Sequence, residues 1–312
     1  MNFKTIADLD SCIVKNLHKI PRDIDLVVGI PRSGMLAATI IALHLNLPLL
    51  DMDSYLNQVQ FHTGNTKKCE NWIKTTQEAK KVLVVDDSIS SGKAMNEAKM
   101  LTKRIASVKH FFLAVYALEL TSLMVDIFFE IVSQPRMFEW NFMHHWALEY
   151  ACVDIDGVLC EDPTFFQNDD GKRYREFIEN AAPKFIPTKK VAYIVSARLE
   201  KYRKETEEWL HKNKIEYGKL ILLDEPDAAS RRKNVNHGSY KGEIFKNTDC
   251  SLFIESSYEQ AVEICRTSGK QCYCTGKACL ITPEGVTVHL KILANDWRFT
   301  AKRIVKKLLK LI

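Results

Sequence analysis

Two pairs of carboxylates follow apolar runs in this 312-residue chain, and both could serve phosphate chemistry. Asp86 and Asp87 come directly after KVLVV and precede a loop of small residues. Asp154 and Asp156 follow the run YACV and lie two residues apart. Acids at the carboxyl ends of strands project into the crevice where ligands bind in open α/β sheets. The sequence therefore predicts two phosphate-handling sites.

The first acid pair is suited to a phosphorylated ribose. Asp86 and Asp87 can accept hydrogen bonds from vicinal ribose hydroxyls. Residues 88–93 form a small-residue loop that opens a helix, where backbone N–H groups and the helix dipole favour a dianion such as a 5-phosphate. Glycine permits close backbone approach, and serines add hydroxyl donors. The residues expected to hold the phosphate are Ser88, Ser90, Ser91, Gly92 and Lys93.

The run VLVVDDSISSGK resembles the signature of the type I phosphoribosyltransferases, in which apolar residues, two acids and a Thr/Ser/Gly loop follow one another. A second loop, GIPRSG at residues 29–34, resembles the family's pyrophosphate loop. This resemblance implies that Arg32 and Ser33 contact the diphosphate of phosphoribosyl diphosphate. It also implies Mg²⁺ as the cofactor, on the diphosphate and the ribose hydroxyls.

The resemblance has two further consequences along the chain. Residues 55–72 occupy the place of the family's mobile loop, with Lys67 and Lys68 as candidate closing charges. Lys93 and Ala94 stand where the family often has Gly and Thr, so one hydroxyl donor is lost and one ammonium gained. We expect phosphate binding to survive this change.

The second acid pair, in VDIDG, is suited to phosphate removal. If Ile155 points into the core, Asp154 and Asp156 face the same side of the strand end. One carboxylate can then attack phosphorus to form an aspartyl-phosphate. The other can protonate the leaving alcohol and later activate water.

This pattern resembles the haloacid-dehalogenase-type (HAD) phosphohydrolases. The resemblance implies that Ser196 binds phosphate, that Lys241 balances charge around the nucleophile, and that Glu255 ligates magnesium. Many members have two Asp at the last position, whereas Ser256 follows Glu255 here. The implied Mg²⁺ site therefore consists of Asp154, the Asp156 carbonyl and Glu255, completed by waters.

The spacing of these residues leaves no room for a large cap domain. DPTFFQNDDGKRYREFIENAAPKF, between Asp156 and Ser196, could form a small flap. Capless members of the family tend to accept bulky substrates, because nothing closes over their site.

Alternating strand-like and helix-like patterns in both halves predict an α/β chain of parallel sheets wrapped by helices. One predicted helix has its apolar face at Ala94, Ala98, Leu101 and Ile105. We expect a phosphoribosyltransferase domain at residues 1–148, a Rossmann-like HAD phosphatase domain with a minimal cap at 149–290, and a basic amphipathic helix at 291–312. Residues 272–290 are expected to be a β-rich extension.

The composition indicates a folded protein of the cytoplasm. Apolar residues make up 46% and charged residues 27%, as in soluble domains, and the net charge of +5 does not argue for nucleic acid. The N-terminus is not expected to be a secretion signal. Nine cysteines, an odd number, favour a reducing compartment over a disulfide framework.

Three weaker features leave alternatives open. The aromatic residues near residue 140 could stack on an acceptor base or form an interdomain core, and His144 and His145 could be acid–base groups or structural donors. Cys272, Cys274 and Cys279 lack zinc-ribbon spacing and are expected to be free thiols. The basic tail could lie on the inner face of an anionic membrane or dock on its own domain.

Taken as a whole, the chain resembles the dual-domain ribofuranosyltransferases of surface-polysaccharide assembly, including FEWN, VDIDGVLC and FIES. The resemblance implies that phosphoribosyl is transferred to a glycan, possibly lipid-linked, and then trimmed to plain ribofuranose. Two alternatives stay open: a nucleobase phosphoribosyltransferase, of purine or orotate type, fused to a HAD phosphatase, and a regulator that senses phosphoribosyl diphosphate.

Overall fold

The structure is a computed structural model that describes residues 1–59, 72–168 and 170–290. The chain divides into two compact units, one of Asn2–Trp140 and one of Asn141–Ile312 joined by Met1. The division lies between residues 140 and 141, whereas the sequence pattern placed it after residue 148. The segment with Lys67 and Lys68 and the basic tail lie outside the described residues.

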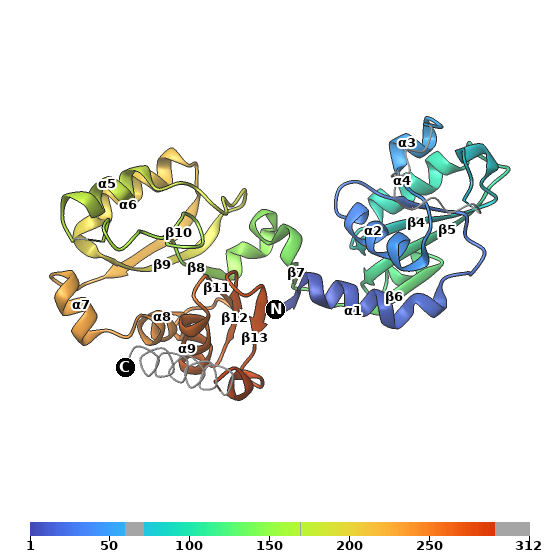
Figure 1. The fold of residues 1–312 in the computed structure, drawn as a ribbon. Coiled ribbons are helices and arrows are strands. Elements are labelled where there is room, and N and C mark those ends of the chain that lie inside the picture. The colour runs from blue at the N-terminus through green and yellow to red at the C-terminus, as the bar shows by residue number, and fades with distance from the viewer. Residues whose placement is uncertain (60–71, 169, 291–312) are drawn as a thin grey trace, which may run out of the picture. The chain divides into compact units, whose positions relative to one another are not determined.

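The N-terminal unit is built on a five-stranded parallel sheet with the order β3-β2-β4-β5-β6 (Figure 1). Its strands are β2 (Leu26–Gly29), β3 (Leu49–Asp51), β4 (Lys81–Ile89), β5 (Lys109–Ala117) and β6 (Ile127–Ile131). Its helices are α1 (Ile6–Asn16), α2 (Gly34–Leu45), α3 (Met52–Leu56) and α4 (Lys93–Thr102). A separate parallel pair joins β1 (Asn2–Lys4) to β7 (Arg136–Phe138).

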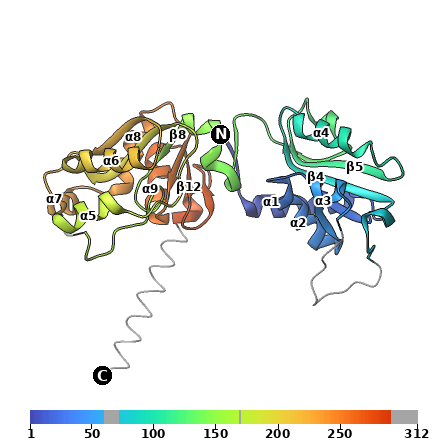
Figure 2. The same ribbon diagram turned by 90° about the horizontal axis from the view of Figure 1, so that it is seen from above.

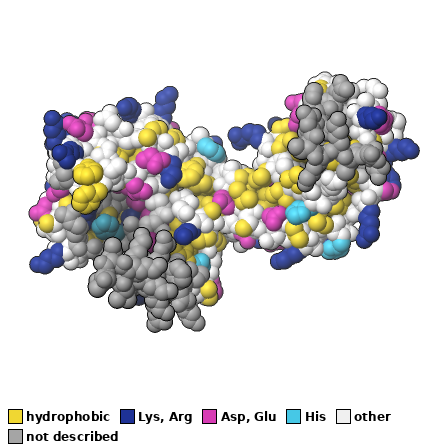
Figure 3. Space-filling view, viewed as in Figure 1, with side chains coloured by type: hydrophobic (Ala, Val, Ile, Leu, Met, Phe, Trp, Pro, Cys, Tyr) yellow, Lys and Arg dark blue, Asp and Glu magenta, His cyan; other side chains and the backbone are white. Residues whose placement is uncertain are grey.

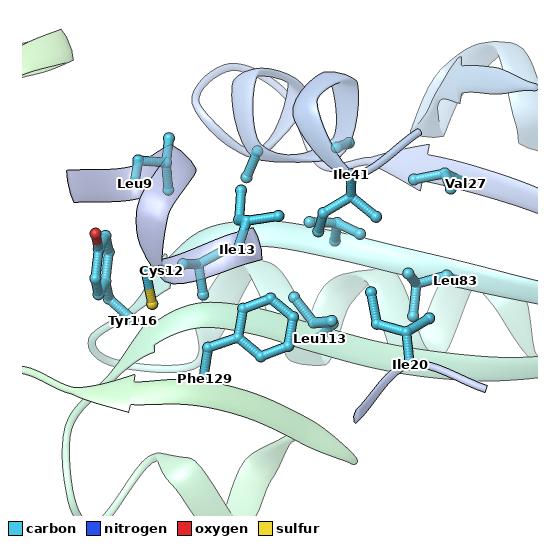
Figure 4. Packing of buried hydrophobic residues seen from close by; sticks show 14 of the residues in the cluster. Leu9, Cys12, Ile13, Ile20, Val27, Ile41, Leu83, Leu113, Tyr116 and Phe129 are labelled. Carbon is cyan, nitrogen blue, oxygen red and sulfur yellow. The ribbon is translucent and has the colours of Figure 1, made fainter. Parts of the chain in front are cut away.

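Apolar side chains cover both faces of this sheet, as a parallel sheet requires. Alternate residues of the central strands point to opposite sides: Leu83 packs with α1 and α2, and Val84 packs with α3 and α4. Figure 4 shows the first of these two clusters, where Ile13 of α1 and Ile41 of α2 approach Leu113 of β5. Seen from above in Figure 2, α4 lies on the opposite side of the sheet from α1 and α2.

Two local expectations differ from the structure. Strand β4 continues to Ile89, whose carbonyl accepts hydrogen bonds from Arg136 Nη2 at 2.8 Å and Thr121 Oγ1 at 3.2 Å. Ser88, expected in the loop, is therefore a strand residue. The predicted face of α4 is confirmed at Ala98, which is buried, and is wrong at Ala94, which is exposed. Leu101 is half-buried, and Ile105 packs on the core beyond the end of the helix at Thr102. The buried residues of α4 are Met95, Ala98 and Thr102.

The C-terminal unit contains a six-stranded sheet with the order β10-β9-β8-β11-β12-β13. Its strands are β8 (Ala151–Val153), β9 (Val191–Leu199), β10 (Tyr217–Leu223), β11 (Leu252–Glu255), β12 (Gln271–Cys274) and β13 (Cys279–Ile281). Its helices are α5 (Lys172–Asn180), α6 (Arg203–Lys212), α7 (Ala228–Asn234), α8 (His237–Lys246) and α9 (Tyr258–Ser268). Five strands are parallel, and β13 pairs antiparallel to β12.

Helices lie on both sides of this second sheet (Figure 1). Phe245 of α8 and Ile264 of α9 pack against Phe253 of β11 on one side, and α5 and α6 pack together on the other. The expected β-rich extension at residues 272–290 ends at Ile281, since residues 286–290 are helical. Both units thus have the predicted α/β architecture.

The surface of each unit carries charges of both signs, and the cysteines and helices of the described residues show neither disulfide bonds nor membrane-spanning length. Acidic and basic side chains are spread over the visible face of each unit (Figure 3). The cysteines of the described residues, including Cys272, Cys274 and Cys279, form no disulfide bond. None of the helices described is long and apolar enough to cross a membrane.

Candidate functional site

In the N-terminal unit, the fold brings the two loops of the first candidate site together. The loop at residues 30–33 leads from β2 into α2, and the acid pair lies near the carboxyl end of β4. Since β2 and β4 are neighbours, the loops meet: Ile30 N donates to Val85 O at 2.9 Å. The Ser33 hydroxyl donates to Asp87 Oδ1 at 2.8 Å instead of capping its own helix.

The acid pair itself is buried. Asp86 is 9% exposed and Asp87 is 2% exposed, and the Asp87 amide donates to Asp86 Oδ1 at 3.0 Å. Burial first, and then the neighbouring Asp87 carboxylate, raise the pKa of Asp86 to about 8. Ionising the buried pair therefore carries an electrostatic cost, which donors from a bound ligand could offset.

The loop that follows leads directly into α4. Ser90, Ser91 and Lys93 are exposed there, and the Lys93 amide donates to Ser91 Oγ at 3.4 Å. Gly92 has a φ of 77°, and a Cβ on it would lie 2.2 Å from Met124 Cε. The position therefore requires glycine. Arg32 is exposed in the neighbouring loop, so the predicted residues lie on two loops, one before α2 and one before α4.

A tryptophan that the sequence left undecided belongs to this site. Trp140 Nε1 donates to Asp87 Oδ2 at 2.7 Å. Its ring stacks on Phe138 at 4.9 Å, and Phe138 stacks on Tyr116 at 5.5 Å. Phe142, two residues later, packs at 5.5 Å from rings of the C-terminal unit. The aromatic segment is therefore divided between the two units.

The raised pKa of Asp86 predicts that stability depends on pH. The folded chain holds this proton to about pH 8, whereas the ordinary value is 3.8. The stabilising contribution is therefore complete below about pH 4 and is lost as the pH rises towards 8. Asp86→Asn should reduce the fall in unfolding free energy between pH 5 and 8 by at least about 1 kcal/mol. Urea unfolding at a series of pH values measures this, with the exposed Glu119→Gln as the matched control. Identical pH profiles for both variants would contradict the assignment.

In the C-terminal unit, a buried lysine joins two acids. Lys241 of α8 donates to Asp154 Oδ2 and to Glu255 Oε2, both at 2.7 Å, and to Gln260 Oε1 at 2.9 Å. Burial lowers the pKa of Lys241, but Asp154 and then Glu255 outweigh it and raise the pKa. Burial raises the pKa of Asp154, with the Lys241 ammonium opposing that shift. Three of the predicted residues therefore form one charge cluster.

Asp156 has a partner that the sequence analysis missed. The fully buried Arg198 donates through Nη2 to Asp156 Oδ1 at 2.7 Å and through Nε to Asp156 Oδ2 at 3.1 Å. Burial lowers the pKa of Arg198, yet the Asp156 carboxylate outweighs burial and raises it. Arg198 follows Ser196 by two residues on β9, and its amide donates to Ser196 Oγ at 3.2 Å. The one sequence feature that could have pointed to this partner is the arginine at the end of the run VSAR, residues 195–198.

A pocket of about 340 Å³ opens over these side chains. Gly157, with a φ of 77°, turns the chain beneath it, where a Cβ would lie 2.2 Å from Ser256 Oγ. Arg231 also borders the pocket, with a buried Nε that has no hydrogen-bond partner among the described residues. The predicted residues that line the pocket are Asp154, Asp156, Ser196, Lys241 and Glu255.

One oxygen of the predicted magnesium ligands is available to an ion, whereas both oxygens of Glu255 accept hydrogen bonds from Lys241, Ser256 and Ser257. Asp154 Oδ1 is buried and has no hydrogen-bond partner among the residues described. The Asp156 carbonyl lies nearby and accepts from Ser256 Oγ at 3.3 Å. The described ranges contain no cluster of three His, Cys, Asp or Glu side chains suited to a metal. The predicted set needs two such side chains, because its third ligand is a backbone carbonyl and waters complete it.

Comparison with known proteins bears on the N-terminal unit. Residues 3–141 match the family model of the phosphoribosyl transferase domain, which spans less than half of the chain. No curated protein matches. Solved structures similar to this part include a purine phosphoribosyltransferase from Pyrococcus horikoshii Ot3, with 20% identity, a TM-score of 0.33, and coverage of 45% of this chain and 92% of that one.

Two further solved structures that are similar to this part of the chain are also phosphoribosyltransferases. The xanthine-guanine-hypoxanthine phosphoribosyltransferase of Helicobacter pylori shows 15% identity and a TM-score of 0.34, covering 45% of this chain and 92% of its own. The orotate phosphoribosyltransferase of Aeropyrum pernix shows 16% identity and a TM-score of 0.27, covering 39% and 67%. The family match assigns residues 3–141 as a phosphoribosyl transferase domain.

Proposed function

We propose that the N-terminal unit transfers 5-phosphoribosyl from phosphoribosyl diphosphate to a glycan, and that the C-terminal unit then removes the 5-phosphate. One observation carries the proposal. A single chain combines a buried acid pair, beside a small-residue loop, with a lysine that bridges two buried carboxylates at 2.7 Å. Transfer followed by trimming gives each site a purpose in one reaction sequence.

In the transfer step, the bond between ribose C1 and the diphosphate breaks, and an acceptor hydroxyl oxygen bonds to C1 while its proton is released. Asp86 and Asp87 would accept hydrogen bonds from the ribose hydroxyls. Asp87 is held in place for this by Ser33 and Trp140, at 2.8 and 2.7 Å. The loop before α4 would bind the 5-phosphate through backbone amides.

In the trimming step, the Asp154 carboxylate attacks phosphorus while the bond from phosphorus to the ribose O5 breaks. Asp156 supplies the proton for the leaving alkoxide, then takes one from the water that hydrolyses the aspartyl-phosphate. Arg198 holds Asp156 by two bonds, so this fork must loosen for the proton to move. Ser196 and Arg231 border the same pocket and would bind the phosphate.

Magnesium is the expected cofactor of both steps, and the residues that would hold it in the trimming step can be named. In the C-terminal unit, Asp154, the Asp156 carbonyl and Glu255 would hold the ion, with Asp154 Oδ1 as its available carboxylate oxygen. When bound, Mg²⁺ supplies positive charge that stabilises the charge developing on phosphate oxygens. Lys241 shares that task, because it already lies between Asp154 and Glu255.

A nucleobase is the second candidate acceptor for the transfer step. Trp140 is half-buried beside Asp87, where an aromatic ring could stack on a planar base. Against this, removing the 5-phosphate of a newly made nucleotide would convert it to a nucleoside, so the two activities would work against each other. A glycan gives the second unit a productive role, since trimming leaves an ordinary ribofuranosyl residue.

A direct comparison of acceptors tests the proposal. The protein is incubated with phosphoribosyl diphosphate, Mg²⁺ and either a set of nucleobases or a lipid-linked glycan, and the products are identified by mass. We expect a ribosylated glycan without phosphate and no nucleotide. Formation of a nucleotide or nucleoside, with the glycan unchanged, would replace the glycan by the nucleobase as the acceptor.

A further inference from the structure

A second pocket, of about 600 Å³, lies beside the phosphatase pocket in the C-terminal unit and has no part in the chemistry above. The two pockets share Asp162 as a wall residue. The chain after it separates them: Pro163 and Asn168 line the phosphatase pocket, and Thr164 and Gln167 line the larger one. A substrate can therefore occupy both pockets around one thin loop.

The larger pocket has an aromatic side chain at its mouth. Phe166 lines it and is 74% exposed, so its ring is accessible to a ligand. The turn that carries Phe166 is fixed, because Gln167 Oε1 accepts from the Thr164 amide and from its hydroxyl, both at 2.9 Å. The Gln167 amide nitrogen takes no part in these two bonds, so its two donors can serve a ligand.

The opposite wall is polar and comes from one face of α5. Arg173, Glu176 and Asn180 recur there at three- and four-residue spacing, all exposed and all lining the pocket. Cationic, anionic and amide groups placed in this way offer both donors and acceptors. An aromatic ring opposite alternating donors and acceptors is suited to a sugar, which has apolar C–H faces and hydroxyl edges.

The floor of the larger pocket connects it to the catalytic residues. Phe177 lines this pocket, and its ring lies 6.0 Å from the Arg198 guanidinium. Arg198 in turn holds Asp156 in the phosphatase pocket at 2.7 Å. The floor is anchored from behind, since Trp209 Nε1 donates to Ala181 O at 2.8 Å. The two pockets are thus linked through the contact between Phe177 and Arg198.

We propose that this larger pocket binds the sugar residues of the glycan whose ribose 5-phosphate enters the phosphatase pocket. Phe166 is the platform for a sugar ring, and the polar face of α5 binds its hydroxyls. This inference rests on the proposed function and adds the substrate class of its second step. It makes the phosphatase selective for a phosphoribosyl group carried on an oligosaccharide.

The test compares three phosphate esters: methyl ribofuranoside 5-phosphate, a trisaccharide ending in ribofuranoside 5-phosphate, and guanosine 5′-monophosphate. Wild-type protein should hydrolyse the trisaccharide ester with kcat/KM about tenfold or more above the other two. Phe166→Ala should remove this advantage through KM and leave the methyl ribofuranoside ester unchanged. Phe166→Tyr should retain it. The matched control is Phe165→Ala, because Phe165 is 90% exposed and packs on Phe166 without lining the pocket.

Equal rates on the three esters, preference for the nucleotide, or an equal loss on all esters in Phe166→Ala would overturn the proposal. Binding of the phosphate-free trisaccharide is measured by calorimetry, which tests sugar binding in the larger pocket separately from the proposed phosphatase activity. If no ester is hydrolysed, the phosphatase assignment fails, yet trisaccharide binding weakened by Phe166→Ala would still support the pocket. Binding that is absent or unaffected by Phe166→Ala would overturn it.

Discussion

Asp154→Asn should stop the reaction after the transfer step, so that a glycan carrying phosphoribosyl instead of ribosyl accumulates. The amide cannot form an aspartyl-phosphate, so the trimming step should slow by about a thousandfold or more. The product should be heavier than that of wild-type protein by about eighty daltons, the mass of one phosphate group. Mass spectrometry of the glycan after reaction with phosphoribosyl diphosphate measures this.

The variant retains the shape of the site, because Asn can keep one oxygen towards Lys241. Asp249→Asn, at an exposed position of the same unit, is the matched control and should give the trimmed product. If Asp154→Asn releases inorganic phosphate from ribose 5-phosphate as fast as wild-type protein, the nucleophile has been assigned to the wrong residue.

The double variant Asp86→Asn with Asp87→Asn should abolish the first step and spare the second. Both carboxylates that would hold the ribose hydroxyls are lost, and the bonds from Ser33 and Trp140 to Asp87 lose their charge. We expect transfer to fall by about a hundredfold or more. Pyrophosphate release reports on transfer, and hydrolysis of ribose 5-phosphate reports on the other unit.

The matched control is Asp10→Asn with Asp53→Asn, which removes the same charge from two exposed positions of the N-terminal unit. This control should transfer normally. Normal transfer by the Asp86/Asp87 double variant would show that the acid pair does not bind the donor. Loss of both activities would indicate instead that the variant has lost its fold, which circular dichroism would reveal.

The architecture could be predicted because its signals are local. Short apolar runs rich in Val, Leu and Ile, such as residues 82–85 and 252–254, favour buried strands when turn residues and helical patterns lie on either side of them. Ends of elements were less predictable, since they depend on distant partners. Strand β4 reaches Ile89 because it pairs with β5 as far as Ala117, and Arg136, 47 residues away in the chain, binds the Ile89 carbonyl. The buried face of α4 likewise differs from the expected one, since Met95 and Thr102 are buried and Ala94 is exposed.

The site shows the same contrast. Asp154, Lys241 and Glu255 could be named from ordered motifs, and the structure brings them within hydrogen-bonding distance. The partners that orient the acids could not be named in this way. Arg198 contacts Asp156 across 42 residues, and Trp140 contacts Asp87 across 53 residues, without any spacing rule that links them. Only the folded sheet brings such pairs together.

The central claim, that one chain both transfers and trims, is tested most directly by counting the phosphates released. Wild-type protein reacts with phosphoribosyl diphosphate, Mg²⁺ and a glycan acceptor while pyrophosphate and inorganic phosphate are measured in parallel. We expect inorganic phosphate to follow pyrophosphate after a lag and to reach the same amount, in step with the ribosyl groups found on the glycan. Pyrophosphate release without inorganic phosphate, with the product still phosphorylated, would contradict the central claim.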